Sequence, residues 1–295
     1  MIDYVEGLPR RGLAVTAMLG SAALFAVMTA AARMLSDTRW TRPLPTGEIT
    51  LARFVTGIVV MLPLLFYPSA RLLGTDRPGL VWRGLSGGIA VYFYFLAIRY
   101  TTLTNAVLMN LTSVIFAPIC AWLFLKEPIS RRAAAGIVVA FGGIVLVTRP
   151  TLSHIRLGDL YGLISGVLAG TAITAVRRLR RDETASSVFF YFSLVGAPVA
   201  LLTLIGDRLV WPDPAGWRLL AVMAVSSIAA QVLMTYGYRY VTTAQGVLLT
   251  LSQILYSGAI GAALFGEPIL WTTLVGALMI ITAGAVVSLA PRHAP

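Results

Sequence analysis

The sequence predicts an all-α integral membrane protein with ten transmembrane helices in two inverted five-helix repeats. Only 12% of its 295 residues are charged and 58% are hydrophobic, whereas about a quarter of a soluble protein is charged. The chain also contains many apolar runs near the ~20 residues that a helix needs to cross a bilayer. Finally, a segment that begins at Arg99 returns in similar form at Arg239.

Ten apolar runs, bounded by charged residues, Pro or Gly, give the predicted spans. We expect helices in all of them, because backbone groups in lipid must form hydrogen bonds within their own segment. Very short connections join the third span to the fourth and the eighth to the ninth, which predicts tight hairpins. The ranges are 13–32, 48–67, 82–98, 104–125, 133–149, 158–177, 187–205, 217–238, 242–264 and 269–290.

The first run follows Arg10 and Arg11 and could be taken for a signal peptide. We interpret it as a span, since the apolar region of a signal peptide is about 7–15 residues long and further runs follow. The single cysteine, Cys120, lies within an apolar run. Its position indicates packing, and one cysteine excludes a disulfide framework or a cysteine metal cluster.

Basic residues indicate the orientation, because Lys and Arg prefer the cytoplasmic side of a membrane. With the N-terminus inside, the predicted cytoplasmic segments hold more basic residues than the outer ones, and Arg83 is counted among them. The sequence therefore predicts a multi-pass protein of the bacterial cytoplasmic (inner) membrane with both termini in the cytoplasm. The formal charge of +11 follows from these clusters, so we expect no nucleic-acid partner.

An internal repeat relates the two parts of the chain. The segment "RYTTLTNAVLMNL" (99–111) aligns without a gap with "RYVTTAQGVLLTL" (239–251), and the match continues through Glu-Pro-Ile at 127–129 and 267–269. Apolar composition alone would give scattered matches rather than clustered ones. A true duplication is therefore the better interpretation.

The repeat predicts two halves of five spans each, residues 1–149 and 150–295. Because five is odd, the second half must lie upside down relative to the first. Inverted repeats are typical of transporters, which expose one site to the two sides in turn. A duplicated membrane scaffold without transport is the alternative.

The two Glu-Pro-Ile turns differ in charge. Lys126, Arg131 and Arg132 surround the first copy, and the second has no basic neighbours, as expected if only the first lies in the cytoplasm. We expect the prolines to start the fifth and tenth spans. Glu127 and Glu267 would then lie near the positive N-terminal ends of those helices.

The ten spans in two halves, the short hairpins, Pro118 in the fourth span and the acidic turns before the fifth and tenth spans resemble the EamA family of the drug/metabolite transporter (DMT) superfamily. The resemblance covers nearly the whole chain. It implies a central cavity surrounded by the first, third, fourth, sixth, eighth and ninth spans, and export of a small metabolite. Small multidrug relatives in the superfamily use a carboxylate midway along their first span. This chain has none there, which disfavours export of cationic drugs by proton antiport.

Neutral polar and aromatic groups are the expected solute-binding residues, because all twelve acids and both histidines fall in predicted loops or at span ends. Positions seven and eleven residues apart share a helix face. This spacing puts an amide, a hydroxyl and an aromatic ring on the fourth span and again on the ninth. Hydrogen bonding between helices is the alternative role for each residue. The predicted cavity residues are Tyr92, Phe95, Asn105, Thr112, Phe116, Gln231, Thr235, Tyr238, Gln245, Ser252, Gln253 and Tyr256.

Arg53 is the one basic residue well inside a predicted span. Its side chain could extend to the membrane interface or anchor a substrate carboxylate. Pro63, Pro118 and Pro198 are candidate hinges, with static kinks as the alternative. Glycines at every fourth position from Gly158 to Gly170 predict close helix packing on the sixth span.

The sequence lacks the motifs of enzymes. There is no G-x-x-x-x-G-K-[ST] loop for ATP and no His-Glu-x-x-His metal site, so we expect no catalytic residue, metal or cofactor. The expected partners are a small-molecule solute and the lipid bilayer, and a monomer fits.

The predicted function is a secondary transporter or facilitator that exports a small polar metabolite by alternating access. Amino acids, aromatic or other neutral ones, are the first candidates. The alternatives are a drug, nucleoside or sugar exporter of the same fold, a lipid or lipid-linked sugar flippase, and an intramembrane enzyme.

Overall fold

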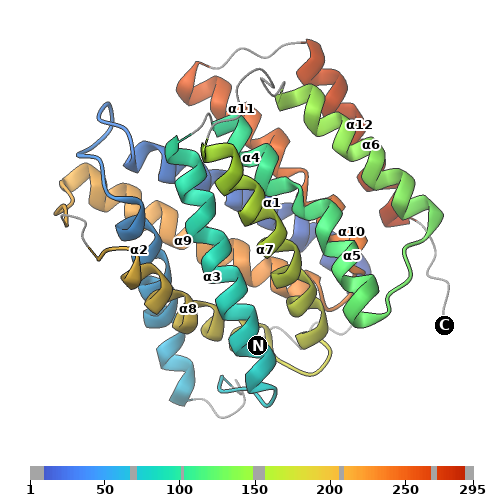
Figure 1. Cartoon of the computed structure of the whole chain (residues 1–295), viewed down its shortest axis with the longest axis horizontal. Coiled ribbons are helices and arrows are strands. Elements are labelled where there is room, and N and C mark those ends of the chain that lie inside the picture. The colour runs from blue at the N-terminus through green and yellow to red at the C-terminus, as the bar shows by residue number, and fades with distance from the viewer. Residues whose placement is uncertain are drawn as a thin grey trace.

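The computed structural model describes residues 10–66, 72–100, 103–148, 157–205, 209–266 and 271–289. In these ranges the chain forms helices and no strand (Figure 1), so the predicted all-α class is confirmed. The helices are α1 (Arg10–Leu35), α2 (Thr46–Met61), η1 (Leu62–Phe66), α3 (Arg77–Tyr100), α4 (Leu103–Leu111), α5 (Ser113–Leu125), α6 (Arg131–Thr148), α7 (Leu157–Leu179), α8 (Ala185–Leu202), α9 (Pro214–Gly237), α10 (Thr243–Thr250), α11 (Gln253–Phe265) and α12 (Trp271–Leu289).

Seven helical stretches in the described part of the chain are long and apolar enough to cross a membrane. They correspond to the predicted first, second, third, sixth, seventh, eighth and ninth spans. The described residues of the other three predicted ranges, 104–125, 133–149 and 269–290, also lie on helices, apart from Thr112. Crossing by these three remains a prediction, as does the total of ten.

The predicted fourth and ninth spans are each interrupted at a hydroxyl residue. Thr112 separates α4 from α5, and Ser252 follows α10 just before α11. The Thr112 hydroxyl donates to the carbonyl of Met109 at 2.6 Å, and the Ser252 hydroxyl donates to the carbonyl of Leu249 at 2.8 Å. Such bonds compete with the helical ladder and bend helices, which explains two breaks that apolar periodicity does not reveal.

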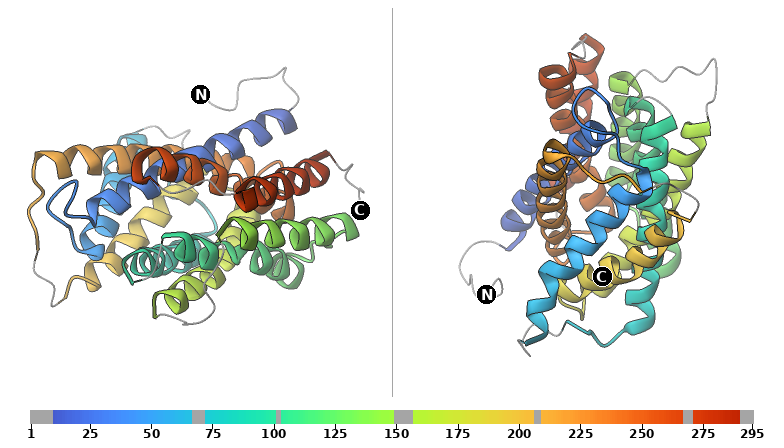
Figure 2. Two further views of the ribbon diagram at one scale, coloured as in Figure 1. Left: turned by 90° about the horizontal axis from the view of Figure 1, so that it is seen from above. Right: turned by 90° about the vertical axis from the view of Figure 1, so that its left-hand side faces the viewer.

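Helices that are distant in the sequence pack side by side. Helix α1 lies on α9, α3 lies on α7 and α8, and α6 lies on α12. The α6–α12 pair stands on one side of the bundle, and α2 and α8 lie on the opposite side (Figures 1 and 2). The bundle therefore interleaves early and late segments of the chain.

The glycine ladder on the sixth predicted span packs as expected. A Cβ atom on Gly162 would collide with Met109, and one on Gly170 would collide with Phe116. These close approaches bring α7 against α4 and α5, which line part of the site described below.

The bundle has an apolar exterior and polar groups inside. Leu202 is 66% exposed and Val138 is 72% exposed, whereas Ser165 and Thr235 are fully buried. This distribution suits a surface that faces lipid, where an exposed polar group would have no partner.

Helix α3 begins five residues earlier than the predicted span. The carboxylate of Asp76 accepts a hydrogen bond from the Gly79 amide at 3.0 Å, and Pro78 occupies the first turn, where proline is favoured. The same kind of cap starts α9, where Asp213 accepts from the Gly216 amide at 2.6 Å. The earlier start makes Arg83 a residue of the second turn of α3 rather than a loop residue.

The first Glu-Pro-Ile turn differs from its prediction. Pro128 lies before α6 rather than in its first turn, because Ser130 caps that helix by accepting from the Ala133 amide at 3.1 Å. Lys126 ends α5 in the left-handed conformation, with φ of 57°. The turn directs Glu127 away from α6 and toward α10, as described below. The second copy, residues 267–270, lies outside the described residues.

Glu183 joins two connections that are far apart in the sequence. Its carboxylate accepts hydrogen bonds from the amides of Thr75 and Asp76 at 2.6 Å and 2.7 Å, and from the Thr75 hydroxyl at 2.8 Å. Burial by itself raises the pKa of Glu183, but these bonds and one from Ser187 outweigh it, so the pKa lies below its ordinary value. The charged form therefore stabilises the contact between the α2–α3 and α7–α8 connections.

We expect Glu183→Gln to destabilise the protein by about 1–2 kcal/mol at neutral pH, because charge-assisted hydrogen bonds are replaced by neutral ones. A lowered carboxyl pKa stabilises the fold above the ordinary value of about 4.3 and loses this effect as the pH falls through the lowered pKa. Melting temperatures of the two proteins in detergent should therefore converge in acid. The neighbouring exposed Asp182 provides the control, since Asp182→Asn should leave the melting temperature unchanged. Equal stability of wild type and Glu183→Gln at pH 7 would contradict this role.

Candidate functional site

A central cavity of about 140 Å³ lies inside the bundle. Its wall comes from α1, α2, α3, α4, α5, α7, α8, α9, α10 and α11, and α6 and α12 contribute none of the described lining residues. The resemblance implied walls from the first, third, fourth, sixth, eighth and ninth spans, and the helices of all six take part. Helices α2 and α8 add the side chains of Arg53 and Phe192.

Two arginines are buried in the wall of this cavity. Arg53 is 5% exposed and Arg83 is 4% exposed. Their guanidinium carbons lie 5.6 Å and 4.3 Å from the centroid of the Phe192 ring. This geometry is a cation–π contact for both side chains.

The local sequence makes room for Arg83. A Cβ atom on Gly87, one helical turn later, would collide with Nη1 of Arg83 and press on the Phe192 ring. Phe192 is in turn held by an edge-to-face contact with Phe54, with 5.1 Å between ring centroids. The glycine and the aromatic pair therefore fix where the guanidinium lies.

These arginines correct two predictions. Arg53 does not extend to the interface, since its side chain is buried against the cavity. Arg83 was counted with the cytoplasmic segments, but its side chain is buried at the cavity, so the expectation that the wall holds only neutral polar and aromatic groups is wrong. An arginine followed by glycine one turn later, inside a predicted span, is the signal that could have revealed Arg83.

Neutral polar groups complete the wall. Gln231 is 3% exposed, and its side-chain nitrogen Nε2 has no hydrogen-bond partner. Asn110 donates to the Ser165 hydroxyl at 2.7 Å, and Ser165 donates to the carbonyl of Ala90 at 2.7 Å. This chain fixes the Asn110 amide, while the Gln231 amide nitrogen is left without a protein acceptor.

Of the predicted cavity residues, the structure brings Gln231 and Gln253 to this wall. The Asn105 side chain lies outside the described part of the structure. The others are not among the described lining residues, and their roles in binding remain predictions. Thr112 and Ser252 form the helix breaks. The Thr235 hydroxyl donates to the backbone carbonyl of Gln231, and Gln245 completes a capping box with Thr242. The aromatic residues are Tyr92 and Phe95 on α3, Phe116 on α5, Tyr238 at the end of α9 and Tyr256 on α11.

A second, larger pocket of about 380 Å³ lies between α3, α5 and α7. Its rim includes the exposed apolar side chains of Trp82 and Phe124. Its charged residues, Asp76 and Arg178, already pair with each other at 3.3 Å. The unpaired polar groups of the central cavity make that cavity the better candidate for solute binding, despite its smaller volume.

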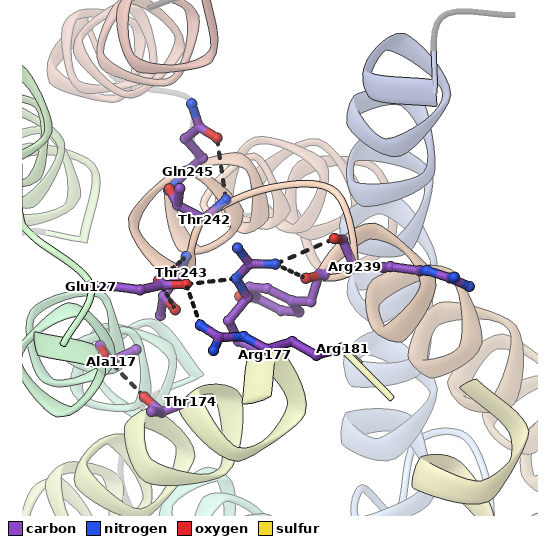
Figure 3. Close-up of polar contacts among 10 residues, drawn as sticks. Ala117, Glu127, Thr174, Arg177, Arg181, Arg239, Thr242, Thr243 and Gln245 are labelled. Atoms are coloured by element: carbon purple, nitrogen blue, oxygen red, sulfur yellow. Dashed lines mark hydrogen bonds and ion pairs between the residues drawn. The ribbon is translucent and has the colours of Figure 1, made fainter. Parts of the chain in front are cut away.

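A cluster of polar contacts closes one end of the bundle, and we call it the Glu127 cluster (Figure 3). Glu127 accepts from Nε of Arg177 at 2.9 Å and from the Thr243 hydroxyl at 3.1 Å, and it lies 3.8 Å from Nη2 of Arg181. Arg177 also donates to the carbonyls of Tyr238 and Arg239, at 3.0 Å and 3.3 Å. The cluster therefore ties the end of α5 to the ends of α7 and α9 and to the start of α10.

The electrostatics of the Glu127 cluster follow from helix ends. Arg177 bonds to the first two carbonyls after the C-terminal end of α9, where a cation is favoured. Glu127 contacts Thr243, the first residue of α10, where an anion is favoured. The side chains of Arg177 and Glu127 are only 14% and 17% exposed. The pair is thus more protected from water than a surface salt bridge, which typically contributes little.

Comparison with known proteins identifies the family. The sequence model of the EamA-like transporter family matches residues 12–149 and again residues 156–289. The chain belongs to the EamA-like transporter family. It is accordingly a multi-pass membrane protein of a transporter family whose partners are a small-molecule solute and membrane lipid.

Two of the similar proteins are named for different substrates, and a third is named only as a solute carrier. The pseudopaline exporter CntI of Pseudomonas aeruginosa is 26% identical over 88% of this chain and 90% of the exporter. Solute carrier family 35 member G1 of Mus musculus is 24% identical over 81% of this chain and 70% of the carrier, and a riboflavin transporter of Brucella anthropi is 25% identical over 66% and 71%. A solved crystal structure aligns with a TM-score of 0.73 at 20% identity, over 93% of this chain and 96% of that one, which shows a shared fold.

We expect Gly87→Ala to destabilise the EamA-like protein by about 1–3 kcal/mol, the usual cost of overpacking, because the added methyl group displaces the Arg83 guanidinium. Gly20→Ala is the matched control, since its Cβ would lie 3.6 Å from Leu233, an ordinary contact, and alanine favours helix. Melting temperatures in detergent provide the measurement. Equal effects of the two substitutions would show that Gly87 does not make room for Arg83.

Proposed function

We propose that this EamA-like protein is a secondary transporter or facilitator that exports small polar metabolites, amino acids first among them, by alternating access around the central cavity. The observation that carries the proposal is a cavity whose wall holds buried polar groups without partners, formed by helices from both parts of the chain. Such sites near the middle of a bundle, between related halves, are typical of secondary transporters. Export follows the direction named for the pseudopaline exporter among the relatives.

Two inverted halves, residues 1–149 and 150–295, provide the symmetry for this mechanism. Support comes from the family model, which matches once in each half. Further support comes from corresponding details, namely the breaks at Thr112 and Ser252 and the left-handed helix ends at Lys126 and Gly266. The proposed orientation keeps both termini in the cytoplasm of a bacterial cell.

The Glu127 cluster is the proposed cytoplasmic gate. At the other end of the bundle, Asp213 accepts from the Thr41 hydroxyl at 2.5 Å and Glu48 accepts from the Val210 amide at 2.6 Å. Alternating access requires one set of contacts to open while the other stays closed. Pro118 within α5 and Pro198 within α8 are the proposed points of bending, together with Pro63 in η1, next to the end of α2.

Counterflow in proteoliposomes tests the function. Vesicles preloaded with one unlabelled solute should accumulate the labelled form of the same solute, across a panel of amino acids, sugars and cationic dyes. We expect accumulation of amino acids and none of cationic dyes, because no acid lines the central cavity among the described residues. Movement of dyes alone, driven by a pH gradient, would contradict the proposal.

We expect Glu127→Gln to open the cytoplasmic end more often. The reporter of opening is Gln253→Cys in a Cys120→Ser background, labelled with a membrane-impermeant maleimide from the cytoplasmic face. Labelling should be about tenfold faster with Glu127→Gln than without it, because loss of a partly buried charged hydrogen bond costs ~1.5–3 kcal/mol. Asp37→Asn breaks an exposed pair, with Arg39 65% exposed, and should not change the rate. Faster labelling from the external face would contradict a cytoplasmic gate at Glu127.

A lipid flippase is the second candidate, favoured by the pocket between α3, α5 and α7. Its apolar rim of Trp82 and Phe124 suits an acyl chain, and Arg178 would suit a headgroup phosphate once it is released from Asp76. Transfer of a fluorescent lipid between leaflets of the same proteoliposomes, reduced by Trp82→Ala, would support this activity. Lipid transfer at the rate of protein-free vesicles would exclude it.

A further inference from the structure

Arg53 and Arg83 bring two positive charges to one small cavity. No Asp or Glu is among the described residues that line the cavity. The ion pairs found in the described ranges lie in connections or at helix ends and involve neither arginine: Asp37–Arg39, Asp76–Arg178, Glu127–Arg177 and Glu127–Arg181. The charge balance of the cavity wall is therefore positive.

A buried charge without a partner is strongly unfavourable. The face of Phe192 compensates in part, because its ring attracts cations. The ring does not satisfy the N–H groups, however, and Nε of Arg53 and both Nε and Nη1 of Arg83 have no acceptor. Among the described residues these donors have no acceptor oxygen within hydrogen-bonding distance, and a ligand could supply one.

A neutral side chain in the wall also lacks a hydrogen-bond acceptor. Nε2 of Gln231, also buried, lacks an acceptor as well, so an amide adds donors beside the two guanidinium groups. A cationic ligand would meet repulsion and no carboxylate. A neutral ligand would leave both charges uncompensated.

We propose that Arg53 and Arg83 bind the carboxylates of a small solute with net negative charge, such as a dicarboxylate or an acidic amino acid. The proposal rests on the proposed function, because it treats the central cavity as the solute site. A planar guanidinium matches a carboxylate with two parallel hydrogen bonds. Both guanidinium groups lie over one Phe192 ring, at 5.6 Å and 4.3 Å, so one small molecule can reach both.

The size of the cavity agrees with this class of solute. Its volume of about 140 Å³ is well below the ~300–1,000 Å³ of sites for drug-sized ligands. The inference also revises the expectation of neutral amino acids, since neutral polar and aromatic groups were the expected solute-binding residues. Acidic rather than neutral amino acids fit a cavity with two arginines.

The test uses pairs of solutes with nearly the same shape and different charge. Glutamate is compared with glutamine, and succinate with succinamide, both for counterflow in proteoliposomes and for stabilisation of the purified protein against heat in detergent. We expect the charged member of each pair to be transported at least about tenfold faster, because the neutral member leaves buried charge unpaired. Only the charged member should raise the melting temperature.

Variants connect this preference to the two arginines. Arg53→Gln and Arg83→Gln should each abolish the stabilisation by succinate, and Arg53→Lys should restore it only in part, because lysine keeps the charge but not the fork. Without solute, Arg83→Gln should melt no lower than wild type, since it removes an uncompensated charge. A purely structural Arg83 would give a lower melting temperature. Arg39→Gln, in an exposed loop, is the control for net charge and should behave as wild type.

The two readouts separate the inference from the proposed function. Binding of succinate without transport would overturn the transport function and leave the anion site standing. Transport of glutamine as fast as glutamate, or unchanged succinate binding in Arg83→Gln, would overturn the anion site and leave transport standing. A preference for a sugar phosphate over every carboxylate would overturn the carboxylate assignment, and no binding or transport of any solute would overturn both.

Discussion

Lipid neither donates nor accepts hydrogen bonds, and this constraint governs where every polar group of the bundle can lie. Buried hydroxyls therefore bond to carbonyls of their own helix, as Thr50 does with Thr46 at 2.7 Å, or of a neighbouring helix, as Ser21 does with Ala230 at 2.7 Å. Arg53, Arg83 and Gln231 depart from this rule. All three line the central cavity, where a solute would satisfy them. The hydroxyls of Ser193, Tyr238 and Ser257 are also buried without a partner, and they are not among the described lining residues.

At the ends of the bundle, charged groups have partners within the protein. Glu127 is paired with Arg177, and Glu183 accepts hydrogen bonds from the amides of Thr75 and Asp76. These contacts join segments that are distant in the sequence. A transporter needs such contacts to be strong enough to close an end and weak enough to break, and paired charges near water meet both needs better than an apolar seal.

Much of the fold could be predicted because membrane spans follow from local composition. Length, apolarity and the glycines of α7 are read directly from the sequence, and the structure confirms the helical class and the close packing at Gly162 and Gly170. The solute-binding residues were harder to predict from the sequence. The proposed stripe on the fourth and ninth spans assumed unbroken helices, but hydroxyl bonds at Thr112 and Ser252 interrupt both. Apolar periodicity does not show which side-chain bonds compete with the backbone.

The sequence by itself determined a helical membrane protein, its internal repeat and its resemblance to the EamA family, because these depend on the order and composition of residues. Only the tertiary structure decided that Arg53 on α2 and Arg83 on α3 share one cavity with Phe192 on α8. Each arginine alone fits a membrane-interface residue. Their burial against one ring, with Gly87 leaving space, depends on how three helices pack, and helix packing is set by side-chain shape across the bundle rather than by local sequence.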